Sequence, residues 1–300
     1  GQIKENALEA VTLNGKIYGM PYNFWYQGVI FNKNIFRKLE LAPPDTLDEL
    51  DIIIEKLKNA EIVPFASHFQ ESWNVANMTM QYMMNDIFKG EPEWGDLFRK
   101  GTVNCVGNEQ MKVCMENNKK ILDASWKDAL QIDQFESDSR FTQGEAAMYL
   151  TGSWSMQFAS QYGKEIQFGI FPFPNQSGDA ALIRETNLTF MKSAHTRYDA
   201  LIDKLLYGIQ NDEKLVQEIL DFTQSDSAVK GIDQDSSIPM QEDIDAYVRE
   251  GRFVDVAQGN SQLVWNFQND AAKEQLSWLK KEKSLEEVLN YMDENRESSI

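Results

Sequence analysis

The sequence predicts an α/β protein, and three observations support this fold class. Amphipathic runs with helical spacing recur along the chain, and short apolar runs suited to strands stand between them. In addition, 42% of the 300 residues are hydrophobic, which is enough for a substantial core and excludes wholesale disorder. The length fits one large domain or two of ordinary size.

The expected elements can be placed in order along the chain. The apolar run 29–31 predicts a buried strand. The capping box Thr46-Leu47-Asp48-Glu49 predicts the start of a helix, and Ser284-Leu285-Glu286-Glu287 predicts another near the end of the chain. Periodicity between these two boxes predicts helices over 108–122, from within 144–150, over 198–209 and over 213–222, and a proline-ended strand over 167–172.

The charge balance disfavours several classes of partner. The chain carries 29 Lys and Arg against 47 Asp and Glu, a net charge of −18. This acid excess repels phosphate backbones and anionic lipid surfaces, so we expect no nucleic-acid partner. No apolar run approaches the length of a membrane span, and no signal segment is visible at the start. The latter observation fits a cytosolic protein and a trimmed secreted one equally well.

Metal and nucleophile chemistry receive little support. Only Cys105, Cys114, His68 and His195 are available, and their scattered spacing suits neither a structural zinc site nor a catalytic triad. Cys114 falls on the apolar stripe of the predicted helix 108–122 and is interpreted as a core residue. A disulfide between the two cysteines remains sterically possible. We therefore expect no metal site and no cofactor.

Enzymatic chemistry has no positive signal either. The sequence has no glycine-rich phosphate loop of the GxxxxGK[ST] type. Pairs of carboxylates suited to glycoside hydrolysis can always be nominated in so acidic a chain, but solvated helix faces explain them equally. We expect no catalytic residues.

Tryptophans in polar, turn-rich surroundings are the more informative signal. Sugars present flat C–H faces edged by hydroxyls, so their sites pair aromatic platforms with amides and carboxylates. A tryptophan can also simply fill the core, and that is our interpretation of Trp94, Trp126 and Trp278, which lie in helical or charged stretches. The tryptophans with the polar neighbours are Trp25, Trp73, Trp154 and Trp265.

Several ordered segments together resemble one family. The segments are Gly15-Lys16-Ile17-Tyr18-Gly19-Met20-Pro21, residues 28–36, residues 43–50, Phe141-Thr142-Gln143-Gly144-Glu145-Ala146-Ala147-Met148 with Gly152-Ser153-Trp154, and Phe171-Pro172-Phe173-Pro174. Their order and spacing are similar to those of the extracellular solute-binding proteins (family 1) of ABC sugar importers. The resemblance runs from Gly15 to the last predicted helix.

The resemblance implies a periplasmic-binding-protein-like (class II) two-lobed fold with a ligand cleft between the lobes. It implies a monomeric, extracytoplasmic protein, periplasmic or lipid-anchored at the outer face of the membrane, that binds a sugar or oligosaccharide and presents it to ABC permease subunits. Trp154, Trp73 and Trp265 would stack on the sugar, and Glu71 would accept a hydroxyl. The remaining implied ligand-binding residues are Trp25, which stands where relatives have a carboxylate, Asn23, Tyr26 and Asn187.

The chain departs from the family pattern at its start. Members carry roughly a quarter of their length before the Gly-Lys-x-Tyr-Gly segment, whereas fourteen residues precede it here. We therefore expect a truncated N-terminal lobe and weak ligand binding. The expected division is residues 1–28 as its remnant and the first hinge, 29–184 as the C-terminal lobe, 185–239 as a return to the N-terminal lobe, and 240–300 as C-terminal-lobe helices.

Two other functions stay open at this stage. A secreted carbohydrate-active enzyme is compatible with the acidic, aromatic-rich composition. The same fold could also bind a non-sugar solute such as a polyamine, a peptide or glycerol phosphate, although these ligands call for charged partners rather than several stacking aromatics.

Overall fold

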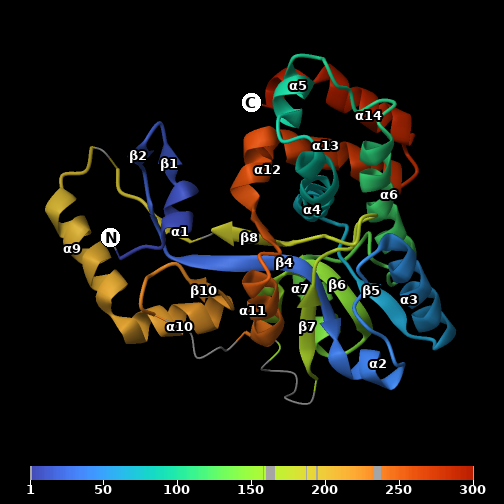
Figure 1. Ribbon diagram of the computed structural model, residues 1–300, viewed down its shortest axis with the longest axis horizontal. Coiled ribbons are helices and arrows are strands. Elements are labelled where there is room, and N and C mark those ends of the chain that lie inside the picture. The colour runs from blue at the N-terminus through green and yellow to red at the C-terminus, as the bar shows by residue number, and fades with distance from the viewer. Residues whose placement is uncertain are drawn as a thin grey trace.

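A computed structural model describes residues 2–157, 159, 166–186, 188–193, 195–232 and 238–299. It has the mixed α/β architecture that the sequence predicts (Figure 1). The strands are β1 Thr12–Leu13, β2 Lys16–Ile17, β3 Met20–Pro21, β4 Asn23–Asn32, β5 Val63–Ala66, β6 Ala146–Gly152, β7 Phe168–Phe171, β8 Leu182–Thr186, β9 Thr189–Phe190, β10 Asp226–Ser227 and β11 Phe253–Asp255. The helices are α1 Glu5–Glu9, α2 Lys33–Lys38, α3 Leu47–Asn59, α4 Ser72–Gly90, α5 Trp94–Arg99, α6 Glu109–Asp123, α7 Gln134–Thr142, α9 Asp199–Asn211, α10 Glu213–Thr223, α11 Gln241–Arg249, α12 Val256–Gln262, α13 Trp265–Leu279 and α14 Leu285–Glu294, with 3-10 turns η1 Ser153–Met156 and η2 Arg296–Ser299.

Strand β4 organises the main sheet. Within the described ranges this sheet has seven strands in the order β11-β8-β4-β6-β5, with β7 and β10 also paired to β4. The first half of β4 pairs with β8 and β10, and its second half pairs with β6 and β7. Gly28 lies where these partners meet, and a Cβ there would approach the Phe171 carbonyl oxygen to 2.7 Å. Only glycine fits this crossing point without a shift of its neighbours.

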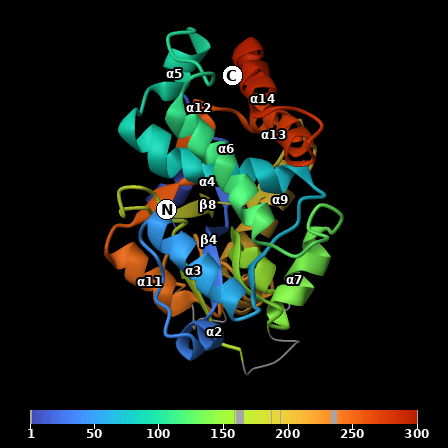
Figure 2. The same ribbon diagram turned by 90° about the vertical axis from the view of Figure 1, so that its right-hand side faces the viewer.

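The two ends of β4 belong to different parts of the molecule. At its first end lie α1, β1–β3, β9, α9 and α10, which we call the small lobe (Figure 1). Around its other end, α4, α12 and α13 lie on one side of the sheet and α2 and α11 on the other, and both views show this layering (Figures 1 and 2). These elements, with α3, α5, α6, α7 and α14, form the large lobe. We call β4 and β8 the crossing strands, because they reach both parts.

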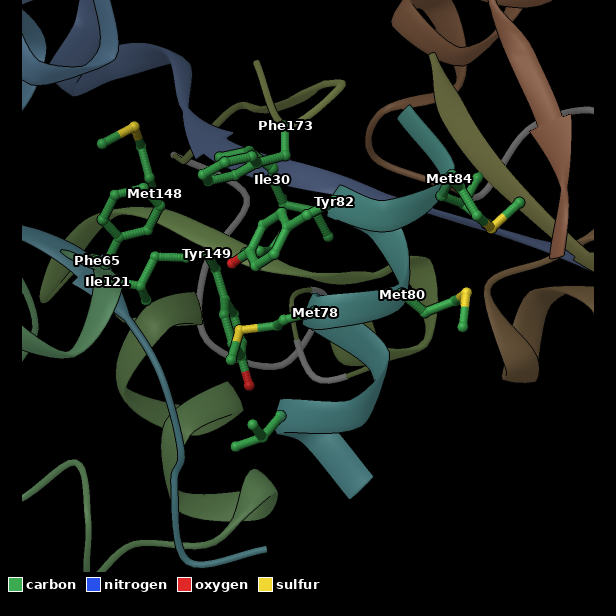
Figure 3. Close-up of a cluster of buried hydrophobic side chains, with 14 of the residues drawn as sticks. Ile30, Phe65, Met78, Met80, Tyr82, Met84, Ile121, Met148, Tyr149 and Phe173 are labelled. Atoms are coloured by element: carbon green, nitrogen blue, oxygen red, sulfur yellow. The ribbon is translucent and has the colours of Figure 1, made fainter. Parts of the chain in front are cut away.

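The core of the large lobe is built around α4, which is rich in methionine. Met78 and Tyr82 point toward Tyr149 of β6 and Phe173 (Figure 3), and the rings of Tyr82 and Phe173 are 4.7 Å apart. On the other side of the same helix, Met80 and Met84 pack against Gly259 of α12; a Cβ at that glycine would meet both sulfur atoms within 3 Å. Helix α4 therefore packs on two sides, with the sheet below and α12 beside it.

Most of the predicted elements are present, and one is wrong. Both capping boxes form, opening α3 after Thr46 and α14 after Ser284. The segment 144–150 was expected to begin a helix, but it forms strand β6, all of whose residues are buried. A strand covered on both faces loses the polar–apolar alternation that identifies strands in a sequence, so its Ala-Ala-Met run mimics a helix.

The two cysteines and the other three tryptophans lie in the hydrophobic core or pack against it. Cys105 and Cys114 are both buried and free, so the disulfide left open by the sequence does not form. Trp94 and Trp126 are buried in the core, and Trp278 packs against it. Within the described ranges, no helix combines the length and apolarity needed to cross a bilayer.

Candidate functional site

A cavity of about 670 Å³ lies where the crossing strands meet α4, α7, η1, α12 and α13. Its lining has a distinctive composition. Four tryptophans line it, together with seven amides, two carboxyls, and the apolar residues Met80, Phe135, Ile183 and Val256. The tryptophans are Trp25, Trp73, Trp154 and Trp265, the amides are Gln27, Asn77, Gln81, Gln134, Gln157, Asn260 and Gln268, and the carboxyls are Asp138 and Glu185.

The crossing strands supply one wall of the cavity through their pleat. Trp25 pairs with Glu185 and Gln27 pairs with Ile183 in the antiparallel register of β4 and β8, so the four side chains share one face. The Gln27 amide donates to Glu185 Oε2 at 2.7 Å. Trp25 Nε1 donates to the carbonyl oxygen of Thr223 at 2.9 Å, which ties this ring to the last residue of α10 in the small lobe.

Trp154 lies beside Trp25 because the chain before it contains glycine. The two rings are 5.1 Å apart with a tilt of 56°. A Cβ on Gly152 would lie 2.0 Å from the Trp154 ring, closer than any contact allows. Because Gly152 has no side chain, the Trp154 ring can lie across the end of β6. This explains why a glycine precedes the tryptophan in the Gly-Ser-Trp pattern.

Trp73 and Trp265 come from the first turns of two helices. Trp73 follows the first residue of α4, and its ring is 5.2 Å from the imidazole of His68. Trp265 opens α13 and remains 43% exposed. Four tryptophans that are far apart in the sequence thus line one cavity, where their rings offer apolar faces to a ligand.

The ionisable groups that line the cavity are acidic. Within the described residues, no Lys, Arg or His lines it, whereas Asp138 and Glu185 do. The nearby Arg184 points to the opposite face of β8 and forms a two-bond ion pair with Asp255, at 2.7 and 2.8 Å. Among the described lining residues, a phosphate or carboxylate ligand would therefore have no cation to pair with.

Asp138 is the most buried ionisable group of the lining. The Tyr149 hydroxyl donates to its Oδ1 at 2.9 Å. Burial raises the pKa of this carboxyl to about 7, against the opposing effect of hydrogen bonds from Ser155, Tyr149 and Gln134.

Glu71 lies behind the cavity rather than in its lining. Its Oε2 accepts a hydrogen bond from the Gln134 backbone N–H at 3.2 Å and is 3.2 Å from His68 Nδ1. It thereby connects the start of α4 to the start of α7. Burial lowers the pKa of His68 to about 4, although Glu71 opposes the shift, so this imidazole is neutral near pH 7.

Asn23 and Tyr26 lie on β4 but do not line the cavity. The Asn23 amide donates to Ser225 Oγ at 2.9 Å, and its oxygen accepts from the Leu188 N–H at 2.8 Å, so it connects β4 to the residues just before β10 and β9. Tyr26 points to the other side of β4, where burial and the adjacent Asp226 raise the pKa of its hydroxyl. Asn187, the remaining implied ligand residue, lies outside the described residues.

Sequence reasoning identified the four tryptophans and missed the polar lining. Six of the seven amides come from five elements and Gln157 follows η1, and no sequence motif links Gln81 of α4 to Gln268 of α13. Asp138 stands six residues before the Gly144-Glu145-Ala146 segment, where its only sequence signal is an acid inside a helix. Their role depends on how distant elements pack.

A tryptophan- and amide-lined cavity beside strands that cross between two lobes defines a binding protein for a small polar solute. The profile of the bacterial extracellular solute-binding protein family matches residues 2–230. The chain therefore belongs to this family, and this confirms the expectation of a binding protein rather than an enzyme.

Known relatives agree with this fold. A multiple sugar-binding protein of Streptococcus mutans is 25% identical over 259 residues, which is 80% of this chain and 58% of that protein. The chain thus spans little more than half the length of this curated relative. Among solved structures, a sugar transporter of Bacillus licheniformis in complex with stachyose superposes with a TM-score of 0.82 at 17% identity, over 98% of this chain and 77% of that one. A chitin oligosaccharide binding protein gives 0.80 at 21% identity, over 99% and 75%.

Proposed function

We propose that this chain is the sugar-binding component of an ABC importer and that it binds an uncharged sugar or oligosaccharide in the cavity described above. The observation that carries the proposal is the lining itself, in which four tryptophans are surrounded by seven amides and no cation among the described residues. Tryptophan faces pack on the C–H faces of sugars, and amides both donate to and accept from hydroxyls.

The names of the relatives support the same ligand class. A multiple sugar-binding protein and a chitin oligosaccharide binding protein are similar to this chain, as is a sugar transporter solved with stachyose. We infer from the family that the protein works outside the cytoplasm, periplasmic or lipid-anchored, and delivers its ligand as a monomer to permease subunits. The net charge of −18 is compatible with an uncharged cargo and a soluble carrier.

The test is a titration followed through tryptophan indole N–H signals by NMR, which detects binding down to millimolar affinity. Stachyose and a chitin oligosaccharide serve as uncharged ligands, and a galacturonic acid oligomer of similar length serves as the anionic comparison. We expect the uncharged sugars to shift several indole signals, and the anionic oligomer to shift none. If neither uncharged sugar binds, the ligand class is wrong; if the anionic oligomer binds as well as they do, the charge argument is wrong.

A pair of tryptophan variants localises the binding. Trp154→Ala removes a ring from the cavity, and we expect at least a tenfold loss of affinity, or about 1.4 kcal/mol. Trp278→Ala removes a ring of the same size outside the cavity and should leave the affinity unchanged. Equal losses in both variants would show that the effect comes from general destabilisation.

A further inference from the structure

We propose that Asp138 is a ligand-contact residue whose ionised carboxylate accepts a hydrogen bond from a hydroxyl of the bound sugar, so that sugar affinity rises with pH. The inference rests on the proposed function, because it assigns a role within the same cavity. Neither the tryptophan pattern nor the residues implied by the family resemblance includes this carboxyl.

The number of hydrogen bonds to the Asp138 carboxylate is smaller than the number that it can accept. The side chain is only 4% exposed, yet it lines the cavity. Tyr149 donates to Oδ1 at 2.9 Å, and Ser155 and Gln134 are its other side-chain partners. A carboxylate offers about four acceptor sites, so three neutral donors leave at least one for a ligand.

Among the residues that the structure describes, no cation lines the cavity beside the Asp138 carboxyl. A buried carboxylate without an ion pair is costly, and an asparagine of the same shape would avoid that cost. The charged group that acts on Asp138 is the acid Asp133, which raises its pKa further and so disfavours the ionised form. A sugar hydroxyl would donate to the carboxylate, and hydrogen bonds to charged acceptors are stronger than those between neutral groups.

The titratable neighbours of Asp138 come from several elements. Asp133 is the N-cap residue of α7, Tyr149 lies on β6, His68 lies behind the cavity, and Glu185 of β8 lines the same cavity. Burial raises the pKa of Tyr149 further above 10 and lowers that of His68 to about 4, so both are neutral between pH 5.5 and 8. The Asp138 carboxyl, whose pKa burial raises to about 7, titrates inside this range.

The direction of the pH effect follows from linkage. A hydroxyl that donates to the ionised form lowers the pKa of Asp138 in the complex, so binding is tighter where the carboxyl is ionised. Because the side chain is already almost fully buried, the ligand adds little desolvation that would raise the pKa again. A shift of one unit corresponds to a tenfold change in affinity.

The experiment compares three proteins at pH 5.5 and pH 8.0 by the same indole N–H titration with stachyose and a chitin oligosaccharide. In the unaltered chain we expect affinity about tenfold higher at pH 8.0. Asp138→Asn should bind more weakly at pH 8.0 and lose the pH dependence. Glu136→Gln changes the same charge on the exposed side of the same helix and should behave like the unaltered chain.

The outcomes separate this inference from the proposed function. If sugar binds with no pH dependence, or if Asp138→Asn and the unaltered chain have the same affinity and profile, the role of Asp138 is wrong and the proposed function stands. If Glu136→Gln also loses the pH dependence, a change in net charge explains the pH dependence, and the proposed contact of Asp138 with the sugar is wrong. If no uncharged sugar binds at either pH, both proposals fall together.

Discussion

The Trp154 ring occupies the space in which any side chain at position 152 would have to lie. The backbone of Gly152 is extended, so glycine is required here for room rather than for an unusual conformation. The Trp25 and Trp154 rings, 5.1 Å apart, depend on this one missing Cβ for their arrangement.

We therefore predict that Gly152→Ala weakens sugar binding by about tenfold while the chain still folds. The added methyl group would lie 2.0 Å from the Trp154 ring, which must rotate out of the platform. Titration of the variant measures the loss, and its circular dichroism spectrum reports the fold. Gly90→Ala, at a helical glycine whose Cβ would meet nothing within 4 Å, is the matched control and should bind normally.

The raised pKa of Asp138 also affects the stability of the ligand-free protein. Because its pKa is raised on folding, from 3.8 to about 7, the folded state holds the proton more tightly than the unfolded state. The contribution of Asp138 to the free energy of unfolding is therefore greatest below pH 4. It falls as the pH rises from 4 to 7 and is constant above pH 7. The ligand-free protein thus carries a destabilising charge at neutral pH.

We predict that Asp138→Asn raises the stability of the ligand-free protein at pH 8 by on the order of 2 kcal/mol, since it removes the buried charge. The gain should shrink toward zero as the pH is lowered to 4. Thermal unfolding at several pH values measures it, with Glu136→Gln as the control for a simple change of net charge. A gain of the same size at pH 4 and pH 8 would contradict the assignment of a titrating carboxyl.

At the scale of helices and strands, local sequence signals decided which elements could be predicted. The capping boxes at Thr46 and Ser284 predicted helix starts to the residue, because a cap depends only on four consecutive residues. Helix α4 gave no clear period, since it is buried on most sides, and β6 was wrongly expected to be helical for the same reason. Burial on all sides removes the periodicity on which sequence reasoning relies.

The residues of the candidate site also differ in whether local sequence could predict them. Each of the four tryptophans was recognisable from its own polar neighbours, which are local. The amides of the lining come from separate elements, and their convergence is set by packing across the cavity. Glu71 was expected to accept a sugar hydroxyl from its sequence context, yet its contact with the Gln134 N–H is with another helix and could not be read locally.

Helices α9 and α10 of the small lobe differ in the exposure of their apolar side chains. On α10, Leu220 is fully buried, whereas on α9 Leu201 and Leu205 are 64% and 59% exposed. Their spacing of four places both on one helix face, and exposed apolar faces of this kind promote self-association.

We predict that the double variant Leu201→Gln, Leu205→Gln folds with unchanged stability and reduces self-association at high protein concentration. The reason is that these side chains lose little water contact in the folded chain. Leu220→Ala should instead destabilise the protein by about 2 to 4 kcal/mol. Analytical ultracentrifugation and thermal unfolding distinguish the two; a strong loss of stability in the double variant would mean that this face is packed.

At the scale of the whole molecule, the two lobes contribute unequally to the cavity. Its lining comes from the large lobe and the crossing strands, and among the described residues none of α1, β1–β3, β9, α9 or α10 contributes to it. The solved relatives are longer than this chain, which covers 75 to 77% of their length. A ligand that the small lobe does not contact keeps part of its surface in water, whereas tight small-molecule sites cover most of their ligand.

We predict that the 300-residue chain binds uncharged oligosaccharides weakly, with a Kd near 1 mM, which corresponds to about −4 kcal/mol. At a sugar concentration ten times the Kd, mass action should stabilise the folded state by about 1.4 kcal/mol and raise its Tm by a few degrees. At the same sugar concentration the stabilisation should fall to about 0.4 kcal/mol or less in Trp154→Ala and stay unchanged in Trp278→Ala, because only the first of these rings lines the cavity. Calorimetric titration gives the affinity directly; a micromolar or tighter Kd would show that the large lobe and the crossing strands suffice for tight binding, and it would contradict this prediction.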